Sequence, residues 1–410
     1  MSLPEETSLP ETTVDQLLAE IRRFCASVVR SAIEGAAAKR PERTITTEQL
    51  TQLSRQAKEL GLLPTGEDGS GAALWETMEG ASGIALSVAA LRAVARENAG
   101  VAFHFHQQSL GEFVARALGL ESTETTPVGT TIVALQGRYG LSAASLARLL
   151  KNRQLNEQDR KQLAEHFLLV ETNVDTNIAD SESVLQFLFQ AAGDWQRLIV
   201  PCFDAASSSG DADALQWAVF NRSDLQVEEL PHSHGLNETN AWRLLSCDTS
   251  PLPVVDIEAA TATRIYREAM QLGALALVAI GLGALEQAYD KATEYAAIRV
   301  QGGKAIDQHA AVQQMLARGS STIRSVELLL EAAARRPLDS GGLSAVLSMR
   351  AQAHNLLCDA ANDMLQVFGG LGYVRETGLE KIVRDNNHLR QLLGTPAELL
   401  LFLAEWERDR

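Results

Sequence analysis

The chain has 410 residues, of which 46% are hydrophobic and only 5% aromatic, and its formal net charge is −16. This length predicts two or three packed modules, and the abundance of Ala and Leu favours a largely helical protein. The acidic balance argues against nucleic acid or an anionic membrane as the main partner, because both select for basic surfaces.

The N-terminal segment 1–13 is acidic and contains proline, so we expect it to be a mobile tail. It lacks the apolar stretch of a secretory signal, and no uninterrupted run of 18 apolar residues occurs in the sequence. The four cysteines are scattered and form no CxxC pair. These features predict reduced thiols and a soluble, cytoplasmic protein without a membrane partner.

Residues 14–127 are predicted to form a helical domain. Apolar residues recur at helical spacing from Val14, and a second helix runs through LTQLSRQAKELG to a C-terminal cap at Gly61. Helical patterns resume at residues 74–98 and 107–118.

Residues 128–255 differ in character. Short runs with β-branched or aromatic residues, QRLIVPCFD, LQWAVFNRSDL and WRLLSC, are separated by turn-rich segments. One helical stretch interrupts them, LSAASLARLL followed by NEQDRKQLAEHFLLV. A small β-rich middle domain is predicted.

Residues 256–410 carry long helical patterns almost without a break, the last one after Thr395 and Pro396. Long antiparallel helices with short connections predict a four-helix bundle.

Within this bundle, the segment QVFGGLGYVRETGLEKIVRDNNHLRQLLGTPA, residues 366–397, resembles the C-terminal signature of the acyl-CoA dehydrogenase family. Segments 85–108, 242–254 and 282–317 are also similar to family segments. The resemblance implies a mainly α fold with a small β middle domain: a helical N-terminal domain, a β-barrel-like middle and a C-terminal four-helix bundle. The matching positions of the signature are Gln366, Gly369-Gly370, Gly372-Tyr373, Glu380, Arg384-Asp385 and Gly394-Thr395.

The resemblance also implies an FAD that lies between subunits. Arg299 and Gln301 match the family's R-x-Q-F-G motif, so Arg299 is expected to contact the pyrophosphate of a neighbour's FAD. Gln366, Gly369 and Gly370 match a turn where missing side chains let the backbone approach the adenosine end.

Each of these residues also has a purely structural interpretation. The two glycines fit an inter-helix turn, and Arg299 fits a solvated cation at a helix end. Thr395 matches a threonine that meets the cofactor, but before Pro396 it also fits a helix N-cap. Arg384 and Asp385 are better explained by a structural ion-pair network.

The family's catalytic base is missing. Dehydrogenation next to a thioester needs a carboxylate that removes an α-proton. Leu393 occupies the usual position of the family's glutamate, and Gly273 occupies the alternative position on the first bundle helix. Glu398 lies five residues beyond Leu393 and is a weak candidate for a replacement base.

The middle domain departs from the family pattern as well. The nearest counterparts of the family's flavin-gripping loop and strand are residues 171–180 and 187–195, where Phe189 replaces a threonine. An own-subunit flavin site is therefore predicted to be degraded. No metal centre is predicted, because the His104-x-His106 pair is better explained by a core or substrate-lining role and His232-x-His234 by a solvated loop.

Three functions fit these observations. The first is a non-catalytic subunit that completes the FAD site of a homologous catalytic subunit in a tetrameric acyl-CoA dehydrogenase, acting in fatty acid or steroid catabolism with a bulky or steroid-type acyl-CoA as a possible substrate. The second is an active flavin-dependent oxidoreductase or monooxygenase of the same fold. The third is a non-enzymatic acyl-CoA-binding or scaffold protein.

Overall fold

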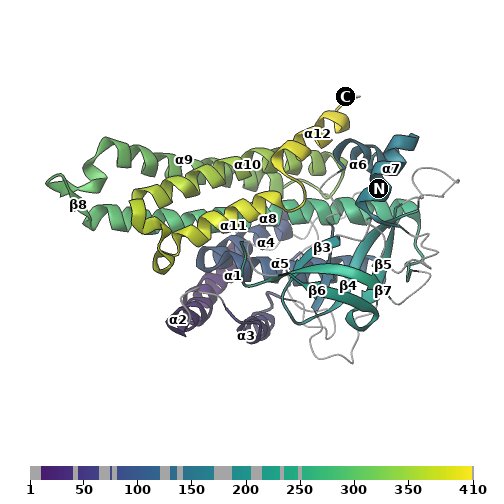
Figure 1. The fold of residues 1–410 in the computed structure, drawn as a ribbon, viewed down its shortest axis with the longest axis horizontal. Coiled ribbons are helices and arrows are strands. Elements are labelled where there is room, and N and C mark those ends of the chain that lie inside the picture. The colour runs from purple at the N-terminus through teal and green to yellow at the C-terminus, as the bar shows by residue number, and fades with distance from the viewer. Residues whose placement is uncertain are drawn as a thin grey trace.

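The computed structural model describes residues 11–39, 45–63, 74–75, 81–120, 130–135, 142–169, 187–204, 215–230, 235–247 and 252–408. Long C-terminal helices run side by side along the length of the molecule, and the N-terminal helices and the strands pack against one side of them (Figure 1). The mainly α architecture with a small β middle part, predicted from the sequence, is confirmed.

The N-terminal helices differ from the prediction at their ends. Their bounds are α1 Glu11–Phe24, continued by a π-helical turn at Cys25–Val29, α2 Arg30–Lys39, α3 Thr47–Glu59, α4 Ala81–Glu97 and α5 Ala99–Ala117. Helix α1 starts inside the predicted tail, whose residues 1–10 lie outside the described part of the chain.

The predicted start of a helix at residue 107 is wrong by two turns. The Asn98 side chain accepts a hydrogen bond from the Val101 amide at 3.0 Å and begins α5 there. Because α5 is buried on almost every side, its first half lacks the polar face that the search for amphipathic spacing requires.

The middle part consists of two small sheets. In the first, β4 Trp195–Phe203 pairs in parallel with β1 Thr130–Val133 and β2 Leu168–Leu169, and antiparallel with β5 Leu215–Asn221. In the second, β7 Asn240–Cys247 lies between β3 Phe187–Ala191 and β6 Leu225–Glu229, all antiparallel. An aromatic cluster packs in this region, with Trp195 edge-on to both Phe189 and Trp242.

The helical stretch that interrupts the strands forms two helices, α6 Ala143–Leu150 and α7 Glu157–His166. Asn156 caps α7 through a capping box, and the following residues 168–169 become strand β2 rather than more helix. Helix α6 packs against the C-terminal helix α12.

The C-terminal bundle is built from α8 Ala259–Ile298, α9 Ala310–Ala334, α10 Ser340–Val367 and α11 Leu379–Gln391, followed by α12 Pro396–Trp406. A short hairpin of β8 Val300–Gln301 and β9 Lys304–Ala305 joins α8 to α9. Helix α8 is long and apolar enough to span a membrane by length and composition, but 94% of that window is buried inside the protein.

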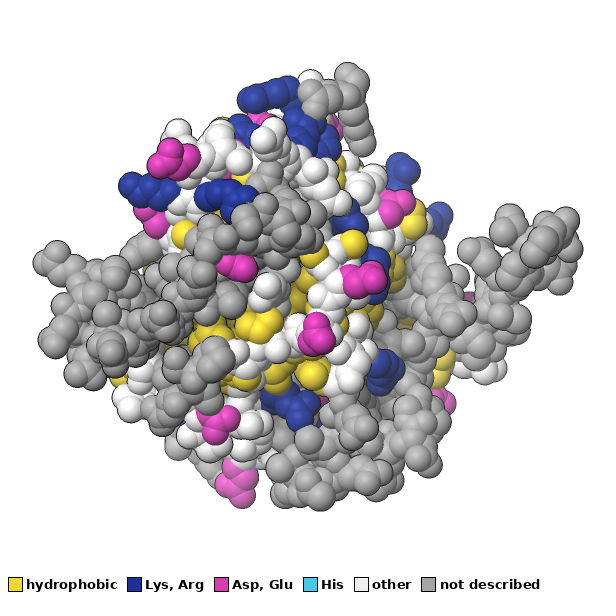
Figure 2. Space-filling view, turned by 90° about the vertical axis from the view of Figure 1, so that its right-hand side faces the viewer, with side chains coloured by type: hydrophobic (Ala, Val, Ile, Leu, Met, Phe, Trp, Pro, Cys, Tyr) yellow, Lys and Arg dark blue, Asp and Glu magenta, His cyan; other side chains and the backbone are white. Residues whose placement is uncertain are grey.

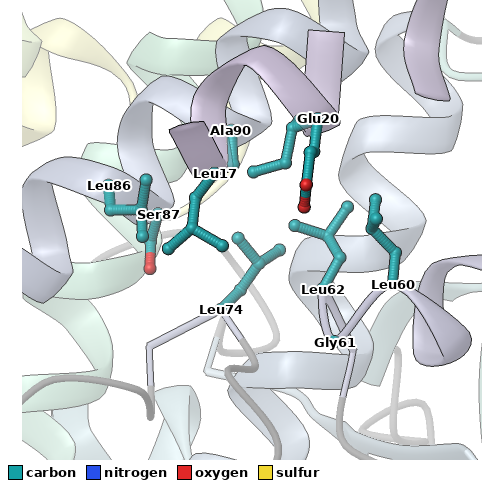
Figure 3. A pocket seen from close by; sticks show the side chains of 10 residues that line it. Leu17, Glu20, Leu60, Gly61, Leu62, Leu74, Leu86, Ser87 and Ala90 are labelled. Carbon is teal, nitrogen blue, oxygen red and sulfur yellow. The ribbon is translucent and has the colours of Figure 1, made fainter. Parts of the chain in front are cut away.

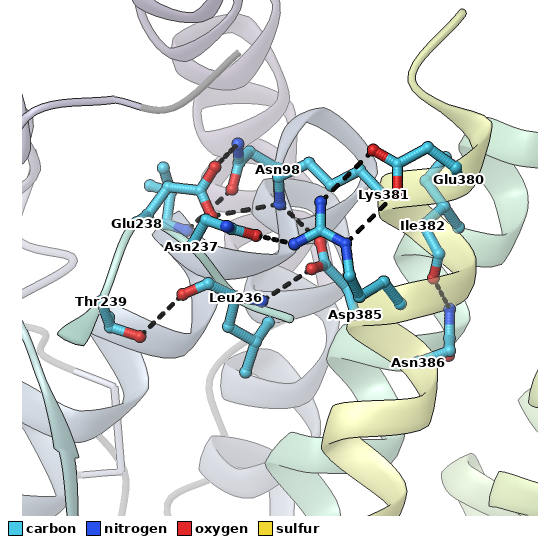
Figure 4. A network of polar contacts seen from close by, with 12 residues as sticks. Asn98, Leu236, Asn237, Glu238, Thr239, Glu380, Lys381, Ile382, Asp385 and Asn386 are labelled. Carbon is cyan, nitrogen blue, oxygen red and sulfur yellow. Dashed lines mark hydrogen bonds and ion pairs between the residues drawn. The ribbon is translucent and has the colours of Figure 1, made fainter. Parts of the chain in front are cut away.

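A buried ionic cluster connects the three parts of the chain (Figure 4). Lys381 on α11 donates to Glu238 at 3.1 Å and to Asp385 at 2.5 Å. Glu238, from the loop before β7, also accepts from the Asn98 side chain at 2.8 Å, and Asp385 accepts from the Leu236 amide at 2.7 Å. Both carboxylates therefore have two partners, which is what burial of charge requires.

The predicted domain boundaries after residues 127 and 255 stay a prediction. The first falls among residues 121–129, which lie outside the described part of the chain.

Removal of the buried cation should destabilise the fold strongly. In Lys381→Met, two buried carboxylates lose their counter-charge, and we expect the free energy of unfolding to fall by about 3–5 kcal/mol. Urea unfolding followed by circular dichroism measures this loss.

Arg264→Met is the matched control, because Arg264 forms an exposed i,i+4 pair with Glu268 on α8. We expect this variant to lose less than about 0.5 kcal/mol. Equal losses in the two variants would show that the buried cluster does not stabilise the fold.

Candidate functional site

Two cavities contain most of the candidate site residues that the sequence singles out. The first, here called the central pocket, has a volume of about 350 Å³ and lies between α5, α8, α11 and the strands of the middle part. Its size is typical of a small-molecule site. Its large apolar lining residues are Phe103, Leu110, Val133, Leu135, Leu188, Phe189, Leu230, Leu277, Leu392 and Leu393.

The two family positions for the catalytic glutamate converge at this pocket. Leu393 lines it, and a Cβ atom added to Gly273 would lie 2.6 Å from the Leu393 Cδ1 atom. The two positions therefore share one space, although they are far apart in sequence. Among the described residues that line the pocket, none is Asp or Glu, so none can remove an α-proton as a carboxylate.

A buried arginine holds the turn that carries Leu393. Arg350 on α10 donates to the carbonyl oxygens of Leu393, at 2.8 Å, and of Leu392. These carbonyls follow the end of α11, where helical partners are missing. Burial lowers the pKa of Arg350 to about 9, and Glu398 partly opposes this shift. Leu393 itself has a φ of +51°, an uncommon conformation for a residue with a side chain.

Glu398 and Thr395 cap the last helix. The Thr395 amide donates to the Glu398 carboxylate at 2.6 Å, and the Glu398 amide donates to the Thr395 hydroxyl at 3.3 Å. This capping box is the structural interpretation of Thr395, and neither residue lines the central pocket. A cofactor contact by Thr395 stays a prediction.

Polar groups of the middle part form a hydrogen-bonded chain beside the pocket. The Thr239 hydroxyl donates to the Leu236 carbonyl at 3.0 Å and accepts from the Gln190 amide nitrogen at 2.7 Å. The Gln190 amide oxygen then accepts from His388 Nε2 at 2.7 Å. Each of these Gln190 groups has a partner within the protein.

The wall that a flavin ring would need from the middle domain is aromatic instead. Phe189, expected in place of the family's threonine, lines the pocket, and its ring packs edge-on against Trp195 at 5.3 Å between centroids. It offers no hydroxyl, so this wall does not fit a flavin held by polar contacts. The other expected counterpart, residues 171–180, lies outside the described part of the chain.

The second cavity, here called the cradle, lies where α8 and α10 end and has a volume of about 720 Å³. Of the six residues predicted to bind FAD, all except Thr395 line this cavity. They are Arg299, Gln301, Gln366, Gly369 and Gly370. Arg299 comes from the end of α8 and the glycines from the turn after α10. The fold therefore brings together two segments that are separated in the sequence by helices α9 and α10.

The cradle has features that suit a diphosphate. Arg299 is exposed, and within the described part of the chain no carboxylate pairs with its guanidinium. Gly369 has a φ of +60°, and a Cβ added to Gly370 would meet no atom within 4 Å, so the backbone of this turn is open to a ligand. These residues fit the ADP part of an FAD.

A small cavity in the N-terminal part and the charge pattern on one face do not suggest a site. The small cavity beside Leu17 and Glu20 has a volume of about 30 Å³, enough for one or two water molecules (Figure 3). On the face shown in Figure 2, the described acidic and basic side chains are interspersed, without an extended basic patch.

The histidines of α5 have the core and lining roles that the sequence favoured. His104 accepts from the Gln108 amide nitrogen at 2.6 Å inside the N-terminal part, and His106 borders the central pocket. Among the described residues, no group of three potential ligands could hold a metal ion. His232 and His234 are not among the described residues.

Sequence reasoning missed two elements of this site. Lys381 and Asp385 lie four residues apart on one helix face, a spacing that indicates an ion pair. The contact of Lys381 to Glu238 has no sequence signal. The Trp75 indole donates to His106 Nδ1 at 3.2 Å, and nothing in the sequence predicts this contact between distant segments.

Comparisons with known proteins agree with this fold. Residues 263–407 match the model of the acyl-CoA dehydrogenase C-terminal domain. The chain is 36% identical to cyclohex-1-ene-1-carbonyl-CoA dehydrogenase of Geobacter metallireducens over 117 residues, which is 28% of this chain and 30% of that protein. It is 27% identical to the CarC subunit of the caffeyl-CoA reductase–Etf complex of Acetobacterium woodii over 172 residues, 40% and 45% of the two chains.

The matched segments thus span less than half the length of these relatives. The fold is similar over the whole chain. Butyryl-CoA dehydrogenase of Megasphaera elsdenii superposes with a TM-score of 0.67 at 17% identity, over 98% of each chain. The three-part architecture and the C-terminal domain define an acyl-CoA dehydrogenase type of fold. The match over residues 263–407, the acyl-CoA dehydrogenase relatives and the fold together support this chain as a member of the acyl-CoA dehydrogenase family.

The shared space of Gly273 and Leu393 can be tested by a double-mutant cycle. Gly273→Ala alone should lower the free energy of unfolding by up to about 1 kcal/mol, because its methyl group displaces the end of the Leu393 side chain toward the pocket. In a Leu393→Ala background the same change should be neutral or stabilise by up to about 1 kcal/mol, because Ala favours the helix. Additive effects in urea unfolding would contradict the shared space.

The buried histidines should make the fold sensitive to acid. Burial lowers the pKa of His106 to about 3 and that of His104 to about 4, where Asp194 opposes the shift, and it holds the pKa of His354 well below its usual range. These rings are neutral when folded but take up protons below about pH 6.5 when unfolded. The stability that these neutral rings contribute is therefore complete above about pH 6.5 and is lost as the pH falls toward 4.

Urea midpoints between pH 7.5 and pH 5 measure this effect, because paired carboxylates titrate at lower pH. Proton uptake by three such histidines in the unfolded chain lowers the free energy of unfolding by up to about 4 kcal/mol for each unit by which the pH falls. A flat midpoint over this window would contradict the prediction.

Proposed function

We propose that this chain is a non-catalytic subunit that completes the FAD site of a homologous catalytic acyl-CoA dehydrogenase subunit in a heteromeric assembly. The single observation that supports this is the contrast between its two cavities. The cradle keeps its cation, glutamine and open glycines, whereas the central pocket has lost both base positions.

In such an assembly the chain binds and orients but moves no proton. Arg299 holds the diphosphate through a planar, permanently charged fork, and the backbone of Gly369 and Gly370 accommodates the nucleotide without steric hindrance. When bound, FAD supplies the hydride acceptor of a dehydrogenation. The carboxylate that removes the α-proton comes from the partner, because Leu393 and Gly273 cannot.

The two alternatives are less well supported. A flavin-dependent oxidoreductase or monooxygenase also works without the glutamate, but it needs its own flavin, and the aromatic wall at Phe189 disfavours one. A scaffold without any flavin role explains Arg299 and the glycine turn one by one, as a solvated cation and an inter-helix turn, but gives no reason for their meeting in one cavity. A cytoplasmic location stays a prediction from sequence.

Co-expression with a base-bearing acyl-CoA dehydrogenase subunit tests the proposal. The purified assembly should contain fewer flavins than subunits and should dehydrogenate acyl-CoA, and the isolated chain should be colourless. A yellow isolated chain with stoichiometric FAD and dehydrogenase activity would contradict it.

Within that assembly, Arg299→Met in this chain should weaken FAD binding on the order of tenfold, because a charge-assisted contact to phosphate is lost. Flavin fluorescence on dilution measures the release. Arg264→Met is the matched control, since it removes an exposed arginine from the opposite end of the same helix. Equal flavin retention in both variants would show that the cradle does not hold FAD.

A further inference from the structure

The central pocket has an apolar body and an uncharged polar wall. Its described lining includes two histidines and three glutamines but no Asp, Glu, Lys or Arg. A pocket of this composition suits a ligand that is mostly hydrocarbon and carries few polar atoms.

The protonated nitrogen of His106 is fixed by Trp75. The Trp75 indole N–H can only donate, and it donates to His106 Nδ1 at 3.2 Å. In a neutral imidazole the proton then lies on Nε2. Among the described residues this N–H has no acceptor, and His106 borders the pocket.

Trp75 is held at both ends for this contact. Its backbone amide donates to the Ser87 hydroxyl at 3.0 Å, and its φ is +72°, which is rare for a bulky residue. Strained residues of this kind cluster at functional sites. In this conformation the indole lies edge-on to the imidazole, at 5.8 Å between ring centroids.

The imidazole stays neutral across the physiological range. Burial lowers the pKa of His106 to about 3, so the ring offers a hydrogen-bond donor without a positive charge. A carboxylate in this pocket would have no counter-ion among the described lining residues, whereas a ketone oxygen needs only a donor.

The Gln190 side chain on the opposite wall does not compete for the ligand's oxygen. The side-chain amide nitrogen and oxygen of Gln190 are hydrogen-bonded to Thr239 and His388. Its backbone carbonyl accepts from the Gln107 side-chain amide at 3.4 Å.

We propose that the central pocket binds an uncharged, largely apolar ligand through one carbonyl oxygen, which accepts a hydrogen bond from His106 Nε2. This goes beyond the proposed function, because it needs neither FAD nor a partner subunit.

Calorimetric titration of the full chain with three probes of equal length tests this. The probes are 2-dodecanone, dodecane and dodecanoate, each solubilised at the same low cosolvent concentration. We expect 2-dodecanone to bind about tenfold more tightly than dodecane, the difference that one hydrogen bond in an apolar site supplies. Dodecanoate should bind more weakly than the ketone at pH 7.5.

Three variants assign the preference to His106. His106→Phe should lose the tenfold preference for the ketone but keep the affinity for dodecane. His106→Gln keeps an N–H donor and should restore part of the preference. Trp75→Phe leaves the imidazole free to place its proton on Nδ1, so the preference should fall while dodecane binding persists.

The proposal is overturned if none of the probes binds, if dodecanoate binds as tightly as the ketone, or if His106→Phe keeps the preference. Should His106→Phe fail to fold, His106→Gln and Trp75→Phe still decide the question, because unchanged affinity in Trp75→Phe contradicts the tautomer argument. Flavin binding by an assembly is measured separately, so failure here leaves the cradle proposal intact.

Discussion

A lysine buried between two carboxylates fixes how the three parts of the chain meet. Lys381 comes from the bundle, Glu238 from the middle part, and Asn98, which also binds Glu238, begins a helix of the N-terminal part. Such a cluster stabilises a fold only when every charge has its full set of partners. A Cβ atom at Gly100 would lie 2.0 Å from the Glu238 carboxylate, so the second position of α5 needs a residue without a side chain.

The central pocket depends on this cluster. His388 lies two helical turns beyond Lys381 on α11 and therefore on the same face. Its partner Gln190 is bound to Thr239, the residue after Glu238. The ionic cluster thus sets the position of α11 against the second sheet, and the pocket forms beside that contact.

Helix α8 connects the pocket to the cradle. Gly273 and Arg299 are 26 residues apart on this helix (299 − 273), which corresponds to about 39 Å. At that distance substitutions in one cavity have little direct effect on the other. The chain can therefore lack a carboxylate in the pocket at one end of the helix and keep an exposed arginine in the cradle at the other.

Much of the architecture could be predicted from the sequence because helical periodicity and turn residues act locally. The long bundle helices were predictable in this way. The association of Arg299 with Gly369 and Gly370 was predictable only through the family resemblance. The start of α5 was not, because a helix buried on all sides has no polar face to mark it.

The sequence by itself determined the helical bundle, the absence of a glutamate at residues 273 and 393, and the presence of a basic residue and glycines near the ends of two helices. Only the tertiary structure decided that Gly273 and Leu393 share one space and that Trp75 orients His106. These facts depend on contacts between segments far apart in the chain. Such contacts leave no periodic signal, because packing selects shape and hydrogen-bond geometry at single positions.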